Sequence, residues 1–272
     1  MTRTRNLPCL ALFAIFLLFV SRTTLGASLA APEAAGMRHV AGKVYVDPEL
    51  ASDRVAGLLE LVAAARRRVT AVYGTVQAEP NIVFCASMNC YQSFGAIGLG
   101  YTDGADLVIA PRGQRAAIVA HELAHVELSK RLGGMAKVMA RIPQWFDEGQ
   151  AVMVSMAEEF SEDAWKAATR DGADAPPLAT LASMADWSRV TGEYGENMQK
   201  SYGTARHEVS RWFNRSGPRG FQALLTALAA NESFATAYVR AEAANARSPV
   251  AEAEPERIAL NGTATPGSAQ LP

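Results

Sequence analysis

Two histidines four residues apart, His121 and His125, constrain the fold of this chain more than any other feature. They stand in the sequence His-Glu-Leu-Ala-His, inside a stretch from Gln114 to Leu132 that predicts a helix and ends at a Gly-Gly pair. Four residues advance a helix by about 400° and about 6 Å, so both imidazoles lie on one face. Two imidazoles so placed can meet one metal ion, and a fold built around them has to bring a third ligand to that face.

Glu122 lies about 100° around the same helix from His121, so it flanks a metal site without having to ligate the metal. There it is placed to take a proton from a water that the metal activates. A surface or core helix that carries two histidines by coincidence is the alternative interpretation, and the motif alone does not exclude it.

Glu148 is the candidate third ligand, because a catalytic zinc usually takes three protein ligands and leaves one position open. It lies 23 residues after His125, in the sequence Trp-Phe-Asp-Glu-Gly-Gln-Ala, near the start of a helix predicted from Pro143 to about Phe160. A carboxylate in such apolar surroundings needs a partner, and a metal would supply one. The alternative is an acidic residue favoured by the helix dipole, although Asp147 already fills that role.

The segments His-Glu-Leu-Ala-His and Pro-Gln-Trp-Phe-Asp-Glu-Gly together resemble the gluzincin metallopeptidases, the thermolysin-like group, and above all the bacterial peptidase MA-like domains. The resemblance covers about residues 43–230; it is specific at the two motifs and loose elsewhere. It implies a zincin-like fold with Zn²⁺ as the cofactor. It also implies that His121, His125 and Glu148 are the zinc ligands and that Glu122 is the general base.

The resemblance carries further expectations and one departure. It implies an edge strand just before the two histidines, where a peptide substrate adds to the sheet, and residues 106–110 stand in that place. Thermolysin-like members carry an Asp four residues after the Glu ligand, but here that position is Val152, and Asp147 is a candidate substitute. A donor to the developing oxyanion is also required; Tyr202 and His207 are the candidates, and the resemblance favours Tyr202.

The first 27 residues have the pattern of a secretory signal peptide. Arg3 and Arg5 precede an unbroken apolar run of 12 residues, Cys9 to Val20, and small residues follow it. Because a spanning helix needs about 20 apolar residues, an uncleaved anchor is the alternative rather than the first expectation. We therefore expect an exported protein, periplasmic or secreted, with no stable membrane insertion if this segment is cleaved.

Export changes what the charges and the cysteines indicate. Without residues 1–27 the chain has 23 Lys and Arg against 27 Asp and Glu, which gives it no electrostatic reason to bind nucleic acid. Cys85 and Cys90 then remain as a pair. In an oxidising compartment a disulfide is expected, with two buried thiols or half of a metal site as the alternatives. Nothing in the sequence indicates the oligomeric state.

The predicted fold class is α+β, zincin-like, with a small mixed sheet packed on the helix of the two histidines and a mainly helical C-terminal half. Alternating or short apolar runs predict strands at 43–47, 81–84 and 106–110, and helical spacing predicts further helices at 50–72, 202–213 and 220–230. The zincin-like metallopeptidase domain is expected over 43–242, after a flexible segment at 28–42 and before a disordered tail at 243–272.

Taken together, the sequence predicts an exported zinc metallopeptidase that hydrolyses a peptide or protein substrate, with Glu122 as the base and Tyr202 polarising the carbonyl. Two alternatives stand beside it: a non-catalytic zinc-containing domain that binds a protein or cell-envelope partner, and a metal-free helical binding module. An intact Glu122 favours the enzyme, because a structural metal has no need of that carboxylate. Endopeptidase and exopeptidase action are not distinguished.

Overall fold

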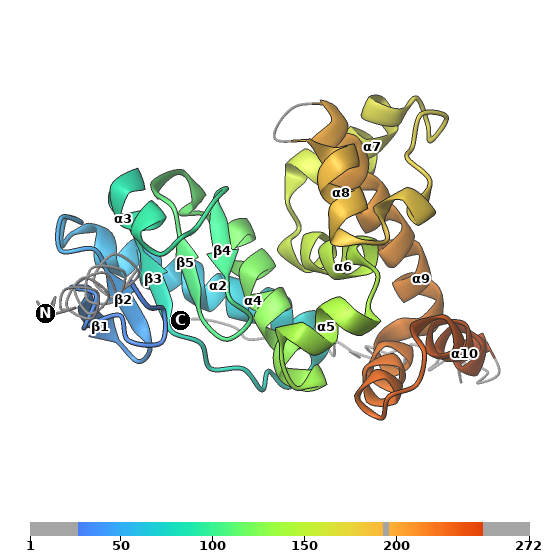
Figure 1. Cartoon of the computed structure of the whole chain (residues 1–272), viewed down its shortest axis with the longest axis horizontal. Coiled ribbons are helices and arrows are strands. Elements are labelled where there is room, and N and C mark those ends of the chain that lie inside the picture. The colour runs from blue at the N-terminus through green and yellow to red at the C-terminus, as the bar shows by residue number, and fades with distance from the viewer. Residues whose placement is uncertain (1–26, 193–195, 247–272) are drawn as a thin grey trace, which may run out of the picture.

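The computed structural model of the protein describes residues 27–192 and 196–246 (Figure 1). The predicted signal segment up to residue 26 and the predicted tail from residue 247 lie outside the described residues. All the described strands lie in the N-terminal half of the chain, and the C-terminal half is helical, so the α+β class is confirmed. No helix among the described residues has the length and apolarity that crossing a bilayer requires.

The described strands form one mixed sheet in the order β1-β2-β3-β5-β4. Their bounds are β1 (Arg38–Ala41), β2 (Val44–Val46), β3 (Ile82–Phe84), β4 (Gly100–Thr102) and β5 (Leu107–Ile109). The three central strands are parallel, whereas β1 and β4 run antiparallel to their neighbours at the two edges. Every residue of β3 and β5 is buried, because both faces of the sheet are covered.

Two expectations about this sheet are wrong. Residues 106–110 contain β5, but β5 lies inside the sheet, and the edge strand beside it is β4, which pairs antiparallel with β5. The uniformly apolar core of 106–110 indicates an interior strand, whereas β4 is partly exposed, as an edge is. The segment 28–42, predicted to be flexible, contains β1 and buries Leu29, whose carbonyl accepts a hydrogen bond from Asn81.

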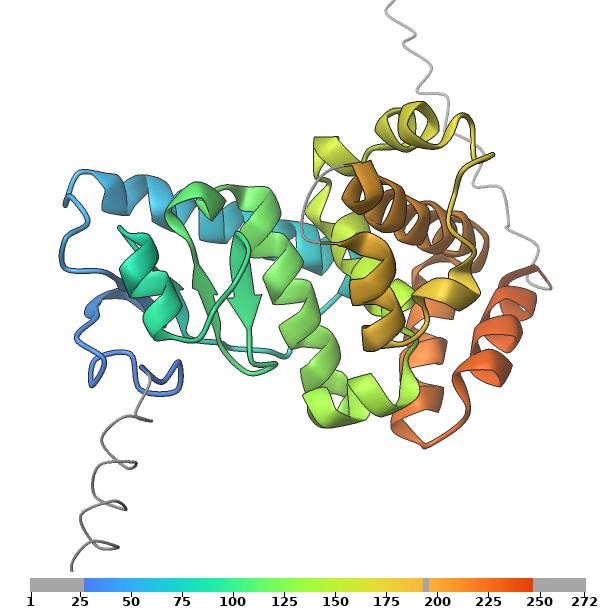
Figure 2. The ribbon, with the colours of Figure 1, turned by 45° about the horizontal axis from the view of Figure 1, so that its top comes forward.

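The two faces of the sheet carry different helices (Figure 2). On one face, α2 (Arg54–Tyr73) and α4 (Ala116–Leu132) share a core with the alternate strand side chains that include Phe84 and Ile109. On the other, Val83 and Val108 pack with the short α3 (Met88–Ser93) and the chain that precedes β1. The predicted helix ending at Leu132 is confirmed, and Gly133 caps it in the left-handed conformation with φ of 83°.

The helical half is built on one long helix, α9. The remaining helices are α5 (Met135–Arg141), α6 (Gln144–Ser155), α7 (Glu162–Thr169), α8 (Met184–Thr191), α9 (Glu196–Ala229) and α10 (Phe234–Ala246). α9 joins the helices predicted at 202–213 and 220–230 across a kink at Gly217, which has φ of 66° and precedes Pro218. α10 continues to Ala246, so residues 243–246 of the predicted disordered tail are helical instead.

α6 connects the two halves, because it packs against both α4 and α9. It is shorter than predicted: it ends at Ser155, where Met156 takes a left-handed conformation with φ of 52°, and a short 3-10 turn (Glu158–Phe160) follows. Gly149 allows the close packing with α9, since a Cβ there would come within 2.4 Å of the Ala205 carbonyl oxygen. The contact of α6 with both neighbours brings residues of α4, α6 and α9 together.

Candidate metal centre

The two histidines of α4 point the same ring atom at one another. The Nε2 atoms of His121 and His125 lie 3.1 Å apart, as the four-residue spacing predicts. Glu148, from α6, completes the group: its Oε2 lies 3.4 Å from the Nε2 of His121 and 3.6 Å from the Nε2 of His125. These three residues form a group that could hold a metal ion.

The separations within the group match the size of a small cation. A cation that holds N and O ligands in tetrahedral directions at about 2.0–2.1 Å keeps the ligand atoms about 3.3–3.4 Å from one another. The three measured separations, 3.1, 3.4 and 3.6 Å, fall around that value. The site is also shielded, since the side chains of His121, His125 and Glu148 are only 18%, 9% and 13% exposed.

Asp147 fixes the ring of His125. Its Oδ1 lies 2.8 Å from the Nδ1 of His125, in the buried space between α4 and α6. With a proton on Nδ1 the lone pair of Nε2 is directed toward His121 and Glu148, as in a metal-binding imidazole. Thermolysin-like members have an Asp at the position of Val152, which here is fully buried and has no carboxylate. Asp147 supplies a carboxylate partner to His125 in its place.

Only one of the two carboxylate oxygens of Glu148 has a hydrogen-bond partner. Its Oε1 accepts a hydrogen bond of 3.1 Å from the Nε2 of Gln144, whereas its Oε2 is buried and makes no hydrogen bond. Burial by itself would raise the pKa of Glu148, but the two imidazoles outweigh burial and hold the pKa far below its ordinary value. A buried anionic oxygen that faces two imidazole nitrogens is a place where a cation is stabilised.

The neighbouring carboxylates raise the pKa of His125, whereas the imidazoles lower the pKa of Glu148. Burial would lower the pKa of His125, but the carboxylates of Asp147 and Glu148 raise it well above its ordinary value. The group thus attracts positive charge strongly, and a metal ion would supply that charge in place of protons.

Glu122 faces the edge strand. A Cβ added at Gly100 of β4 would lie 2.7 Å from both Cγ and Oε1 of Glu122 and 2.9 Å from Ile118, so β4 can lie this close to α4 only because residue 100 has no side chain. Burial, to which the charges of Glu148 and Asp147 add, raises the pKa of Glu122 despite the opposing effect of the histidines. A carboxylate with a raised pKa is a stronger proton acceptor.

Tyr202 reaches the group from α9. Its ring centroid lies 6.4 Å from that of His121, and it is held between Phe160, on which it stacks, and the edge of Trp187. Burial, and then the charges of Glu148 and Glu122, raise the pKa of Tyr202 well above its ordinary value. The phenol therefore keeps its proton and can donate a hydrogen bond at neutral pH.

The structure does not bring His207 to the group. Its ring stacks on Trp165 at 3.9 Å, and its Nδ1 lies 2.9 Å from Glu162. Five residues of helix turn the chain by about 500°, so His207 projects about 140° away from Tyr202 on α9. His39 lies on β1, and its Nε2 lies 2.7 Å from the carbonyl oxygen of Gly42.

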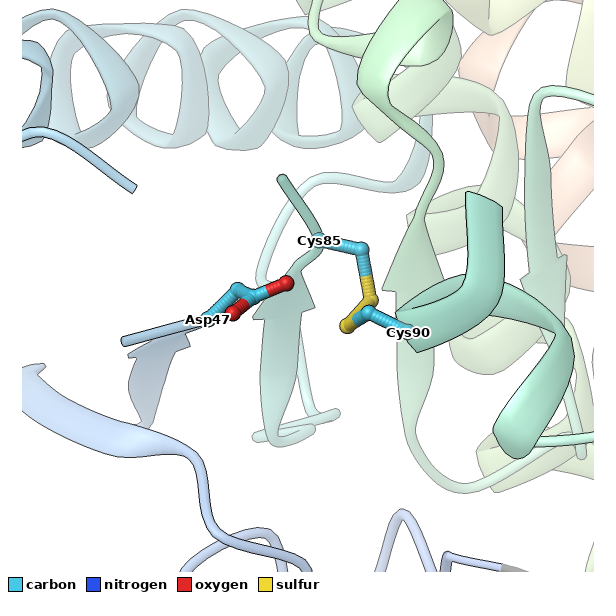
Figure 3. A group of neighbouring side chains, drawn as sticks. All are labelled: Asp47, Cys85 and Cys90. Carbon is cyan, nitrogen blue, oxygen red and sulfur yellow. A yellow bond between two sulfur atoms is a disulfide. The ribbon is translucent and has the colours of Figure 1, made fainter. Parts of the chain in front are cut away.

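A second group of three ligating side chains lies at the C-terminal ends of β2 and β3 (Figure 3). Cys85 and Cys90 form a disulfide, which confirms the predicted pairing and excludes the two-thiol alternatives in this structure. Asp47 lies beside them, but its Oδ1 accepts from the backbone N–H of Glu49 and its Oδ2 from that of Ala86. The ligand atoms of this group are already bonded.

Two residues near the centre had no place in our sequence-based site. Gln144 shares a helix face with Glu148 at a spacing of four residues, a signal that could have been found once Glu148 was the candidate ligand. Gly100 could not have been found, because its contact with Glu122 joins two elements that only the sheet topology brings together.

Comparison of the sequence with protein-family models and with curated proteins finds no match.

Proposed function

We propose that the group is a zinc site and that the protein is a zinc-dependent metallopeptidase of the gluzincin type. The observation that carries the proposal is the triangle formed by the Nε2 atoms of His121 and His125 and the Oε2 of Glu148, with sides of 3.1, 3.4 and 3.6 Å and a buried oxygen that lacks a hydrogen bond. Two imidazoles and one carboxylate form a donor set typical of catalytic zinc, which takes three protein ligands and leaves its fourth position to water or substrate.

When bound, the zinc ion supplies a Lewis acid and makes water a nucleophile at neutral pH. The residues of the chain perform the proton chemistry. Glu122, with its raised pKa, accepts a proton from the attacking water at its carboxylate and returns it to the leaving amine. Tyr202, whose phenol stays protonated, donates a hydrogen bond to the oxygen of the attacked carbonyl.

Substrate recognition in this proposal uses the exposed edge of the sheet. β4 is an edge strand, and its Gly100 lies directly against Glu122. A peptide that adds to β4 is bound through its backbone and passes beside the proposed base. This position favours a peptide over a small-molecule substrate.

A non-catalytic zinc domain that binds a protein partner remains the competing function. It needs the three ligands but neither a base nor an oxyanion donor. The position of Glu122 under Gly100, together with the protonated Tyr202 beside His121, favours catalysis, because neither residue is required to hold a metal.

Metal content tests whether the group is a zinc site, and peptide hydrolysis tests whether the protein is a peptidase. Protein purified without chelator should contain about one zinc per chain by mass spectrometry, whereas His121→Ala should contain none. Glu122→Gln and Tyr202→Phe should both keep the metal, and each should lower the rate of hydrolysis of a mixed peptide library by about 100-fold or more.

The outcomes separate the competing functions. A folded wild-type protein that does not take up added zinc would exclude both metal-dependent functions and leave a metal-free binding module. Bound zinc without hydrolysis of any peptide would favour the non-catalytic domain. Hydrolysis that survives intact in Glu122→Gln would remove Glu122 from the mechanism.

A further inference from the structure

Gln144 occupies a special position at the start of α6. The residue is 7% exposed, and its side-chain Nε2 donates a 3.1 Å hydrogen bond to the Oε1 of Glu148, one helical turn further on. Its backbone N–H donates to the carbonyl of Ala182, which fixes the start of the helix independently of the side chain. The backbone hydrogen bond therefore holds residue 144 in place, and the four-residue helical spacing directs its side-chain amide at the carboxylate of Glu148.

The hydrogen bond decides which oxygen of Glu148 is free. A carboxylate can rotate and can offer either oxygen, or both, to a cation. With Gln144 bonded to Oε1, the oxygen that faces the two imidazoles is Oε2, which lies 3.4 and 3.6 Å from their Nε2 atoms and makes no hydrogen bond. A neutral amide does this without adding a charge, so it neither competes for a cation nor repels one.

We propose that Gln144 is a positioning residue for the metal centre: it holds Glu148 in one orientation and presents a single oxygen to the metal. It does for the carboxylate ligand what Asp147 does for His125 through the 2.8 Å contact at Nδ1. The inference rests on the proposed metal site but not on peptide hydrolysis, so it is testable whether or not the protein proves to be an enzyme.

Gln144 also lines a hollow of about 310 Å³, together with residues that include Ala182 and Ser183. Shortening the side chain to alanine would therefore change two things at once, because it would remove the hydrogen-bond donor and would enlarge that hollow. Methionine has a similar length and no N–H donor, so Gln144→Met isolates the hydrogen bond.

The experiment is a competition titration of zinc against a chromophoric chelator, with wild type and Gln144→Met. We expect the variant to bind zinc about 10- to 100-fold more weakly, the range found when an outer-shell partner of a ligand is lost. Gln150→Met is the matched control: Gln150 is a fully buried glutamine of the same helix, bonded to Tyr73 and to the carbonyl of Asp147. It should lower the melting temperature and leave zinc affinity within about twofold, because no metal ligand depends on its side chain.

A double-mutant cycle distinguishes positioning from general loosening of α6. In a Glu148→Ala background two imidazoles remain, and Gln144→Met should then have no further effect on zinc affinity, since its partner is gone. An unchanged affinity in Gln144→Met, or the same loss in the presence and absence of Glu148, would overturn the inference. A wild-type protein that binds no zinc would instead remove the metal site on which the inference rests.

Discussion

Among the residues that the structure describes there are two clusters of three potential metal ligands, and in only one of them does a ligand atom lack a bonding partner. In the first cluster the Nε2 atoms of His121 and His125 face each other across 3.1 Å, and the Oε2 of Glu148 makes no hydrogen bond. In the second, Cys85 and Cys90 are bonded to each other, and both oxygens of Asp47 accept backbone hydrogen bonds (Figure 3). In both clusters the potential ligand atoms lie within 4.8 Å of one another.

Proximity of ligating side chains is therefore not enough to indicate a metal site. What separates the clusters is whether each polar atom already has a partner, since a buried polar atom without one carries a large desolvation penalty. Asp47 organises its own loop, whereas Glu148 is held by Gln144 on one oxygen and leaves the other for an ion.

The largest expected effect comes from removing one acid from each cluster. Glu148→Ala should weaken zinc binding by more than the about 100-fold upper range for loss of an outer-shell partner, because a ligand itself is lost. Asp47→Ala should leave zinc affinity unchanged and destabilise the fold by about 1–3 kcal/mol, because the N–H groups of Glu49 and Ala86 lose their acceptor. Zinc titration and denaturant unfolding of both variants measure the two effects, and loss of zinc binding in Asp47→Ala would contradict the distinction.

A smaller effect is expected from Asp147, which touches the first cluster without belonging to it. Asp147→Asn keeps the size of the side chain but replaces the acceptor charge at the 2.8 Å contact with His125. Zinc affinity should fall by about 10- to 100-fold, since the imidazole loses the partner that fixes its tautomer. Titration with a competing chelator measures it. Affinity equal to that of wild type would show that the contact with Asp147 does not orient His125 for a metal.

The smallest effect on the metal is expected from the disulfide. Replacing Cys85 and Cys90 together by serine opens a short loop and should destabilise the protein by about 2 kcal/mol in the chain-entropy account. Zinc content should not change, because neither sulfur belongs to the first cluster. Thermal unfolding and metal analysis of the double variant are the measurements, and loss of zinc from a variant that remains folded would connect the two clusters in a way that the structure does not indicate.

Local features of the sequence predicted much of the candidate site. The spacing of His121 and His125, the helix that carries them and its glycine cap follow from short-range rules, and the structure brings Glu148 to them as expected. Asp147, the candidate substitute for the carboxylate missing at Val152, does contact His125. These residues all lie on two helices that are close in the sequence.

Long-range pairing set the limit of prediction. The order of the strands depends on partners far apart in the chain, so β5 was expected at the edge, whereas β4 occupies that position. Short strands of three residues also give little periodicity to detect. His207 was a candidate because it shares a helix with Tyr202, but the direction of each side chain depends on how α9 packs, against Trp165 on one side and near His121 on the other.

The contact between Gly100 and Glu122 has a consequence for how this sequence can change during evolution. A Cβ at position 100 would lie 2.7 Å from the side chain of Glu122, so replacement of the glycine has to displace the glutamate. A lineage that retains Glu122 is therefore expected to retain Gly100, although the glycine performs no chemistry. A lineage that loses the glutamate is released from this restriction, and larger residues would then accumulate at position 100. The two positions should therefore vary together in descendants of this protein. A glycine at position 100 would indicate that the glutamate at position 122 is retained.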